Sequence, residues 1–92
     1  GVYYLSDQKW KHIIEGHPEV KKYISKIRES LISPDIVKVS KKSRSVYLLY
    51  KFYSEIFSGK YFLVVVDVMK REILTAFITD KVKEGDIVWQ KK

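Results

Sequence analysis

The chain has 92 residues, 46% of them hydrophobic and 14% aromatic, so it is large enough for one packed domain and too small for two. It has no cysteine, which excludes disulfides, thiolate catalysis and cysteine-based zinc sites and is typical of the reducing cytoplasm. Eighteen Lys and Arg against eleven Asp and Glu give a net charge of +7, which favours anionic partners. The longest apolar run, residues 61–66, is far too short to cross a membrane, and no signal peptide is visible.

Residues 1–92 are expected to form a single domain excised from a longer chain, because the sequence begins at Gly1 rather than at a methionine. No internal repeat, linker or low-complexity segment divides it. With four glycines and no glycine-rich phosphate loop, the sequence does not indicate nucleotide-triphosphate chemistry.

The first predicted helix covers residues 7–15. Ser6 stands where a side chain caps the helix N-terminus, and Leu5 and Trp10 occupy the two positions of a hydrophobic staple. Gly16 is typical of a helix end, so the helix is expected to stop there.

A second helix is predicted over residues 18–32, because Pro18 suits the first turn and apolar residues then recur at helical spacing. Ser33, Pro34 and Asp35 end this helix and turn the chain. The residues expected on its buried face are Val20, Tyr23, Ile24, Ile27 and Leu31.

After residue 35 the hydrophobic period changes to two, which predicts strands separated by short polar turns. The predicted strands are residues 36–40, 45–52, 61–68, 72–79 and 87–90. Short turns join antiparallel neighbours, so the fold class expected is α+β, with two N-terminal helices packed on one face of a four- to five-stranded antiparallel sheet. The residues expected to be largely buried are Trp10, Ile13, Val20, Ile24, Ile27, Leu31, Val46, Leu48, Val64, Val66, Leu74, Ala76 and Ile78.

The other face of this sheet is then expected to be free for function. On the second strand, Val46, Leu48, Tyr50 and Phe52 share one face and are interpreted as core, so Tyr47 and Lys51 should point away from the helices. On the fourth strand, alternation places Thr75 and Thr79 on the same side as each other.

The segment between Lys9 and Glu19 holds both histidines, His12 and His17. Histidine has the unperturbed pKa closest to neutrality, so a pair of them suits proton transfer. In one unbroken helix five residues correspond to about 500° of rotation and leave the rings about 140° apart. The break at Gly16 would let both rings face one cleft; the alternative is a polar helix end with two solvated histidines.

The segment between Asp35 and Glu55 has no acidic residue, and its basic residues alternate with aromatic ones. This pattern is typical of a surface that attracts phosphates and stacks bases, although a lysine-rich solvated surface over an aromatic core would give it too. The basic residues are Lys38, Lys41, Lys42, Arg44 and Lys51, and the aromatic residues are Tyr47, Tyr50, Phe52 and Tyr53.

Together these residues could cleave RNA without a metal or cofactor, a reaction that needs a base, an acid and donors around the phosphate. The 2′-hydroxyl that such a site would activate is absent from DNA. The predicted catalytic residues are His12 and His17 for proton transfer, Lys51 for the phosphate, and Thr75 and Thr79 for hydrogen bonds. The predicted RNA-binding residues are Lys41, Lys42, Arg44, Tyr47 and Glu19.

Two alternatives remain open. The first alternative is a metal site, since His12, Glu15, His17 and Glu19 lie close together in the sequence. Their spacing, however, is not that of the zinc-binding helix in which two histidines lie one turn apart. The second alternative is a non-catalytic module that binds RNA or protein through the same basic sheet face and needs neither histidine.

The motif Trp10-x-His12-Ile13, followed by His17-Pro18-Glu19, resembles the opening of the phage-associated barnase–EndoU–colicin–RelE-like nucleases. Further resemblance to that family lies in the pattern of residues 31–37, in the strand at residues 61–66, in Ile73-x-Thr75-Ala76-Phe77-x-Thr79 and in Gly85-x-x-x-Trp89. Together these segments cover nearly the whole chain.

This resemblance implies a small, metal-independent, toxin-like ribonuclease domain with its RNA cleft on the sheet. It implies tRNA or mRNA as the substrate and an antitoxin or immunity protein as a partner, with no membrane association. It also places the active-site emphasis on His12, His17 and Glu19 and on Thr75 and Thr79.

Overall fold

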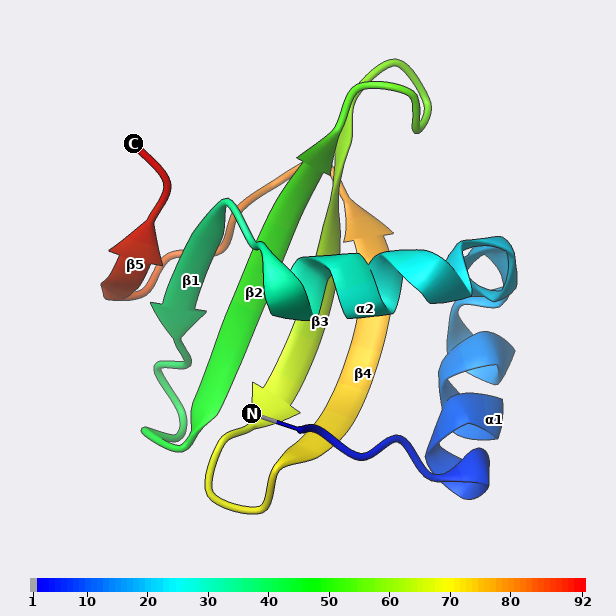
Figure 1. Cartoon of the computed structure of the whole chain (residues 1–92), viewed down its shortest axis with the longest axis horizontal. Helices are drawn as coiled ribbons and strands as arrows, with labels where there is room; N and C mark the ends of the chain where they lie inside the picture. The colour runs from blue at the N-terminus through cyan, green and yellow to red at the C-terminus, as the bar shows by residue number, and fades with distance from the viewer. Residues whose placement is uncertain (1) are drawn as a thin grey trace.

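The computed structural model describes residues 2–92, in which helices precede and cover one face of a five-stranded sheet (Figure 1). The strands lie in the order β4-β3-β2-β1-β5, and every neighbouring pair is antiparallel. The α+β prediction is therefore confirmed. The elements are α1 (Asp7–Gly16), the 3₁₀ helix η1 (Pro18–Tyr23), α2 (Ile24–Ile32), β1 (Ile36–Val39), β2 (Val46–Tyr53), β3 (Lys60–Asp67), β4 (Glu72–Thr79) and β5 (Ile87–Gln90).

Helix α1 begins and ends where the sequence predicts. The Ser6 hydroxyl accepts a hydrogen bond from the Lys9 backbone N–H at 3.0 Å, which satisfies one of the free donors at the helix N-terminus. Gly16 is its last residue, and the N–H of His17 closes the final turn on the Ile13 carbonyl at 2.8 Å.

The prediction of one continuous second helix is wrong, because residues 18–23 wind as a 3₁₀ helix before α2 begins. Tyr23, at φ −120° and ψ 30°, separates the two segments. A 3₁₀ helix places residues three apart on one side, which directs Val20 and Tyr23 inward. The tighter winding also shifts the phase of α2, so Ile24, predicted to be buried, is 56% exposed.

The core lies between the helices and one face of the sheet. Its buried residues are Ile13, Val20, Ile27, Leu49, Tyr53, Ile56, Phe62, Val64, Val66, Ile73 and Ala76. Of the other predicted core residues, six are only half-buried: Trp10, Leu31, Val46, Leu48, Leu74 and Ile78.

The predicted orientation of β2 is wrong. Leu49 and Tyr53 belong to the core under the helices, so Tyr47 and Lys51, which alternate with them, face the helices as well. The error arises because both faces of β2 carry large apolar or aromatic side chains, and a two-residue period then cannot tell which face is inward. The opposite face of β2 carries Phe52, which is 49% exposed rather than in the core.

The helix-free face of the sheet is only partly open, which corrects the expectation that it is entirely free. Strands β4 and β5 form the two edges of the sheet, so residues 80–86 must cross one face to join them, and they pass behind it in Figure 1. The Tyr50 hydroxyl accepts a hydrogen bond from the Lys83 N–H at 3.0 Å, and Lys38 Nζ donates to the Lys83 carbonyl at 2.8 Å. Burial under this loop raises the pKa of Tyr50, while the bond from Lys83 acts in the opposite direction.

Within residues 2–92, none of the helices is long and apolar enough to traverse a bilayer.

Candidate functional site

His17 lies at the edge of the sheet, held between a ring and a carboxylate. It ends α1 in a non-helical conformation, at φ −137° and ψ 74°. Its imidazole stacks on the Phe77 ring of edge strand β4, with centroids 4.8 Å apart and planes 20° from parallel. The Nδ1 atom lies 3.9 Å from a carboxylate oxygen of Glu19. The His17 side chain is 41% exposed, so the ring has a neighbour on two sides and is still open to solvent.

His12 has separate surroundings. It is exposed and lines a hollow of about 390 Å³ with Ser6, Gln8 and Lys9 on the first half of α1. His17 is not among the residues that line this hollow.

The two threonines of β4 lie on the helix-free face, on the same side as Phe77. Thr75 is paired with Val65 of β3, and Thr79 with Tyr61. The Thr79 hydroxyl also accepts a hydrogen bond from the Lys81 N–H at 3.2 Å. Thr79 therefore lies at the turn from which the crossing loop starts. On β4, Thr75 lies two residues before Phe77 and Thr79 lies two residues after it.

An aromatic row crosses the same face beside Thr79. The registers of β2, β3 and β4 align Phe52, Tyr61 and Thr79 across three strands. Tyr61 packs edge-to-face on Phe52, with centroids 5.4 Å apart, and on Tyr50 at 6.0 Å. This row was not predicted from the sequence, because alternation along β2 assigns Phe52 to the core. The feature of the sequence that could have predicted an exposed Phe52 is its position near the end of a strand, where side chains are often incompletely buried.

Lys51 is held at the C-terminus of α2. Its Nζ donates to the Ser33 carbonyl at 2.8 Å and lies 3.2 Å from the Ser33 hydroxyl. A cation in this position stabilises the last, unpaired carbonyls of a helix. Tyr47, also predicted to bind RNA, packs against the core on this same face of the sheet.

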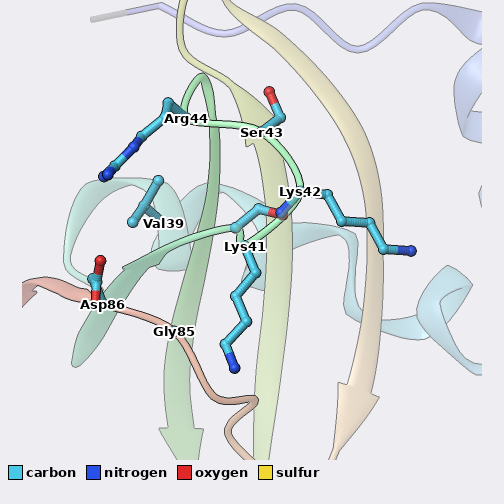
Figure 2. Close-up of a pocket in the computed structure, with 8 residues that line it drawn as sticks. Val39, Lys41, Lys42, Ser43, Arg44, Gly85 and Asp86 are labelled. Atoms are coloured by element: carbon cyan, nitrogen blue, oxygen red, sulfur yellow. The ribbon is translucent and has the colours of Figure 1, made fainter.

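Lys41, Lys42 and Arg44 lie together in the β1–β2 turn, where they line a hollow of about 310 Å³ with Ser40, Ser43 and Asp86. Their side chains diverge from the turn in different directions (Figure 2), and Lys41 Nζ pairs with Glu84 at 3.2 Å. In Figure 1 this turn lies on the far side of the molecule from α1. The three cations thus form a spread positive surface rather than one phosphate pocket.

In residues 2–92, no three histidine, aspartate or glutamate side chains gather closely enough to hold a metal ion. Comparisons of the chain with family models, with curated proteins and with solved structures found no match.

The predicted site residues therefore lie in four separate places on the molecule. His17 and Glu19 meet β4, the strand that also carries Thr75 and Thr79. His12 lies on α1, Lys51 and Tyr47 lie on the helix-covered face, and the three cations lie in the β1–β2 turn. Only the first group combines a proton-transfer group, hydroxyl donors and nearby flat aromatic surface.

Proposed function

We propose that this domain is a metal-independent, toxin-like RNA endonuclease in which His17 is the proton-transfer group. One observation carries the proposal: the exposed imidazole of His17 is held in a fixed plane by Phe77, with the Glu19 carboxylate 3.9 Å from Nδ1. An imidazole that is oriented by a neighbouring carboxylate and open to solvent suits general acid–base catalysis.

In this proposal Nδ1 faces Glu19, which leaves Nε2 to take the proton from an RNA 2′-hydroxyl. The 2′-oxygen attacks the adjacent phosphorus and the bond to the 5′-oxygen breaks, giving a 2′,3′-cyclic phosphate, while a water molecule protonates the leaving 5′-oxygen. The carboxylate orients the ring and stabilises the imidazolium that forms during the transfer. The hydroxyl of Thr75, two residues from Phe77 along the strand, would donate to the phosphate, whereas the Thr79 hydroxyl already donates to the Lys81 carbonyl at 3.2 Å.

Single-stranded RNA is the substrate form that suits this face. Phe52 is half exposed and Tyr61 lies between it and Thr79, so unstacked bases can lie on these rings. Strands are about 4.8 Å apart, which places Phe52 about 10 Å from the backbone of β4. The net charge of +7 supports attraction of the phosphate backbone from any direction.

The test is cleavage of end-labelled single-stranded RNA in EDTA by the wild-type domain and by two matched variants. His17→Ala is expected to lose about 10²-fold or more in rate, the usual contribution of one acid–base group. His12→Ala makes the same chemical change on a separate surface and should stay within about threefold of wild type. An all-DNA analogue should remain intact.

Cleavage that requires an added divalent metal would contradict the proposal, as would equal rates for His17→Ala and the wild type. A non-catalytic RNA-binding module is the second candidate, favoured by the diverging cations of the β1–β2 turn. It predicts RNA binding without product in every variant. It also predicts a smaller salt dependence of binding when Lys42 and Arg44 are replaced by alanine.

A further inference from the structure

A second surface lies on the helix-covered side, beyond the C-terminal end of α2, where no helix covers β1 and β5 (Figure 1). A groove of about 650 Å³ runs there between α2 and the sheet edge. Ile32 on its wall is 70% exposed and Trp89 of β5 is 49% exposed. The groove is lined by Leu31, Ile32, Ser33, Pro34, Val37, Leu49, Lys51, Trp89 and Lys91, so its charged residues are two lysines with no carboxylate.

Strand β5 borders this groove and forms the outer edge of the sheet. All four of its residues are exposed. The Lys91 N–H donates to the Asp35 carbonyl of the neighbouring chain segment at 2.8 Å, so the backbone of Lys91 faces inward. Backbone groups of successive strand residues alternate in direction, so the N–H and carbonyl of Gln90 face outward, where another strand can pair with them.

We propose that β5 and this groove bind an extended, acidic segment of a partner protein, which adds to the sheet as a strand beyond β5. Its backbone would pair with the outward groups of Gln90, and an apolar side chain would enter the groove beside Trp89 and Ile32. A carboxylate two residues from that apolar side chain, and so on the same face of the added strand, would face Lys91. This inference is independent of the proposed ribonuclease activity.

Charge selects this occupant over a second copy of the chain. Pairing of β5 with β5 would bring two molecules of net charge +7 together at an edge that also carries Lys91 and Lys92. The same positive charge attracts a segment that carries an apolar residue with a glutamate two positions away on each side. Residues two apart on a strand share a face, so this segment presents carboxylates and an apolar side chain to the groove together.

The probe is a fluorescein-labelled heptapeptide with leucine at its centre, glutamates two residues away on each side and threonine at the other positions, with binding followed by fluorescence anisotropy. The wild-type domain should bind it, and methylation of alternate backbone amides of the peptide should weaken binding about tenfold or more, because the strand hydrogen bonds are lost. Replacing its glutamates with lysines should abolish binding. Gln90→Pro in the domain removes the outward N–H at an edge position that tolerates proline, and it should weaken binding to a similar extent.

Three results would overturn the proposal. The first is that the acidic peptide does not bind at millimolar concentration. The second is that methylation of the peptide's backbone amides does not weaken binding. This second comparison uses the wild-type domain alone, so it does not depend on whether a variant folds. The third is a concentration-dependent dimer in sedimentation equilibrium that Gln90→Pro dissociates, since a second copy would then occupy the edge. Cleavage of RNA should be the same for Gln90→Pro and the wild type, which separates this surface from the His17 site.

Discussion

The imidazole of His17 and the ring of Phe77 stack 4.8 Å apart, which joins the end of α1 to the edge strand β4 across 60 residues of sequence. The contact orients a partly exposed histidine whose Nδ1 also lies 3.9 Å from a carboxylate oxygen of Glu19. A flat aromatic face restricts a ring in a way that an aliphatic side chain of similar volume does not.

Phe77→Leu tests this relationship. Leucine keeps most of the apolar contact but removes the flat face, so kcat for RNA cleavage is expected to fall about tenfold while KM changes less. Phe57→Leu, at a 68% exposed position in the β2–β3 turn, is the matched control and should leave both constants unchanged. A rise in KM alone would instead indicate that Phe77 contributes to binding and does not position His17.

Gly59→Ala should destabilise the β2–β3 turn. Gly59 has φ +113°, and a Cβ there would lie 2.9 Å from Cζ of Phe52, so both backbone strain and displacement of the ring are expected. We expect a loss of about 1–3 kcal/mol in the free energy of unfolding, measured by urea denaturation.

Gly16→Ala is the control for that experiment, because a Cβ at Gly16 meets no atom within 4 Å. It lies in α1, where alanine is favoured over glycine by about 0.5–1 kcal/mol, so this variant should be more stable than the wild type. Equal effects of the two substitutions would contradict the conformational argument.

Lys51→Met separates a structural role from phosphate binding. The variant keeps the side-chain stem but loses the hydrogen bonds to Ser33 at the end of α2, so the free energy of unfolding should fall by about 1 kcal/mol. RNA cleavage per folded molecule should not change. Lys42→Met, at an exposed position, should alter stability by less than about 0.5 kcal/mol. If Lys51→Met lost RNA cleavage but kept the wild-type free energy of unfolding, the result would instead support the catalytic role predicted for Lys51.

Tyr53 makes stability depend on alkaline pH. Burial raises its pKa above the ordinary value of 10.0, and the hydrogen bond to Glu29 at 2.7 Å and the negative charge of Glu29 add to the increase. Above pH 10 the unfolded chain loses this proton while the folded chain keeps it, so the free energy of unfolding decreases as pH rises.

For one such group the decrease reaches at most about 1.4 kcal/mol per pH unit. Tyr53→Phe should be less stable at neutral pH, because the bond to Glu29 is lost, and should show a shallower decrease above pH 10. Urea denaturation between pH 8 and 11 measures both. If the free energy of unfolding of Tyr53→Phe fell as steeply above pH 10 as that of the wild type, the pH dependence would come from other groups. Tyr50 is one of these, because its pKa is also raised.

The sequence predicted the elements well where local chemistry determines them. Ser6 and Gly16 bound α1 as expected, and the change of hydrophobic period after residue 35 located all five strands within two residues. These features depend on neighbouring residues in the chain, whose capping, turn and alternation preferences are readable without the fold. The paired orientation of Thr75 and Thr79 follows from alternation in the same way.

The candidate site was predicted only in part. His17, Glu19, Thr75 and Thr79 were identified by type, but their surroundings depend on Phe77, which no local pattern marked. Phe52 and Tyr61 were missed as exposed aromatic surface, because aromatic residues in strands are usually core. Burial at a strand end depends on what packs over it, and that information lies elsewhere in the chain.

By itself, then, the sequence determined one α+β domain, the order of its elements, its positive charge and the residue types available for chemistry, because these depend on composition and on local backbone preferences. Tertiary structure alone decided which face of β2 meets the helices, since both faces are apolar and aromatic. It also decided that residues 80–86 cross the sheet to place β5 beside β1, that His17 stacks on Phe77, and that His12 lines a hollow with Ser6, Gln8 and Lys9. These outcomes depend on long-range packing, in which distant segments compete to bury the same apolar surface.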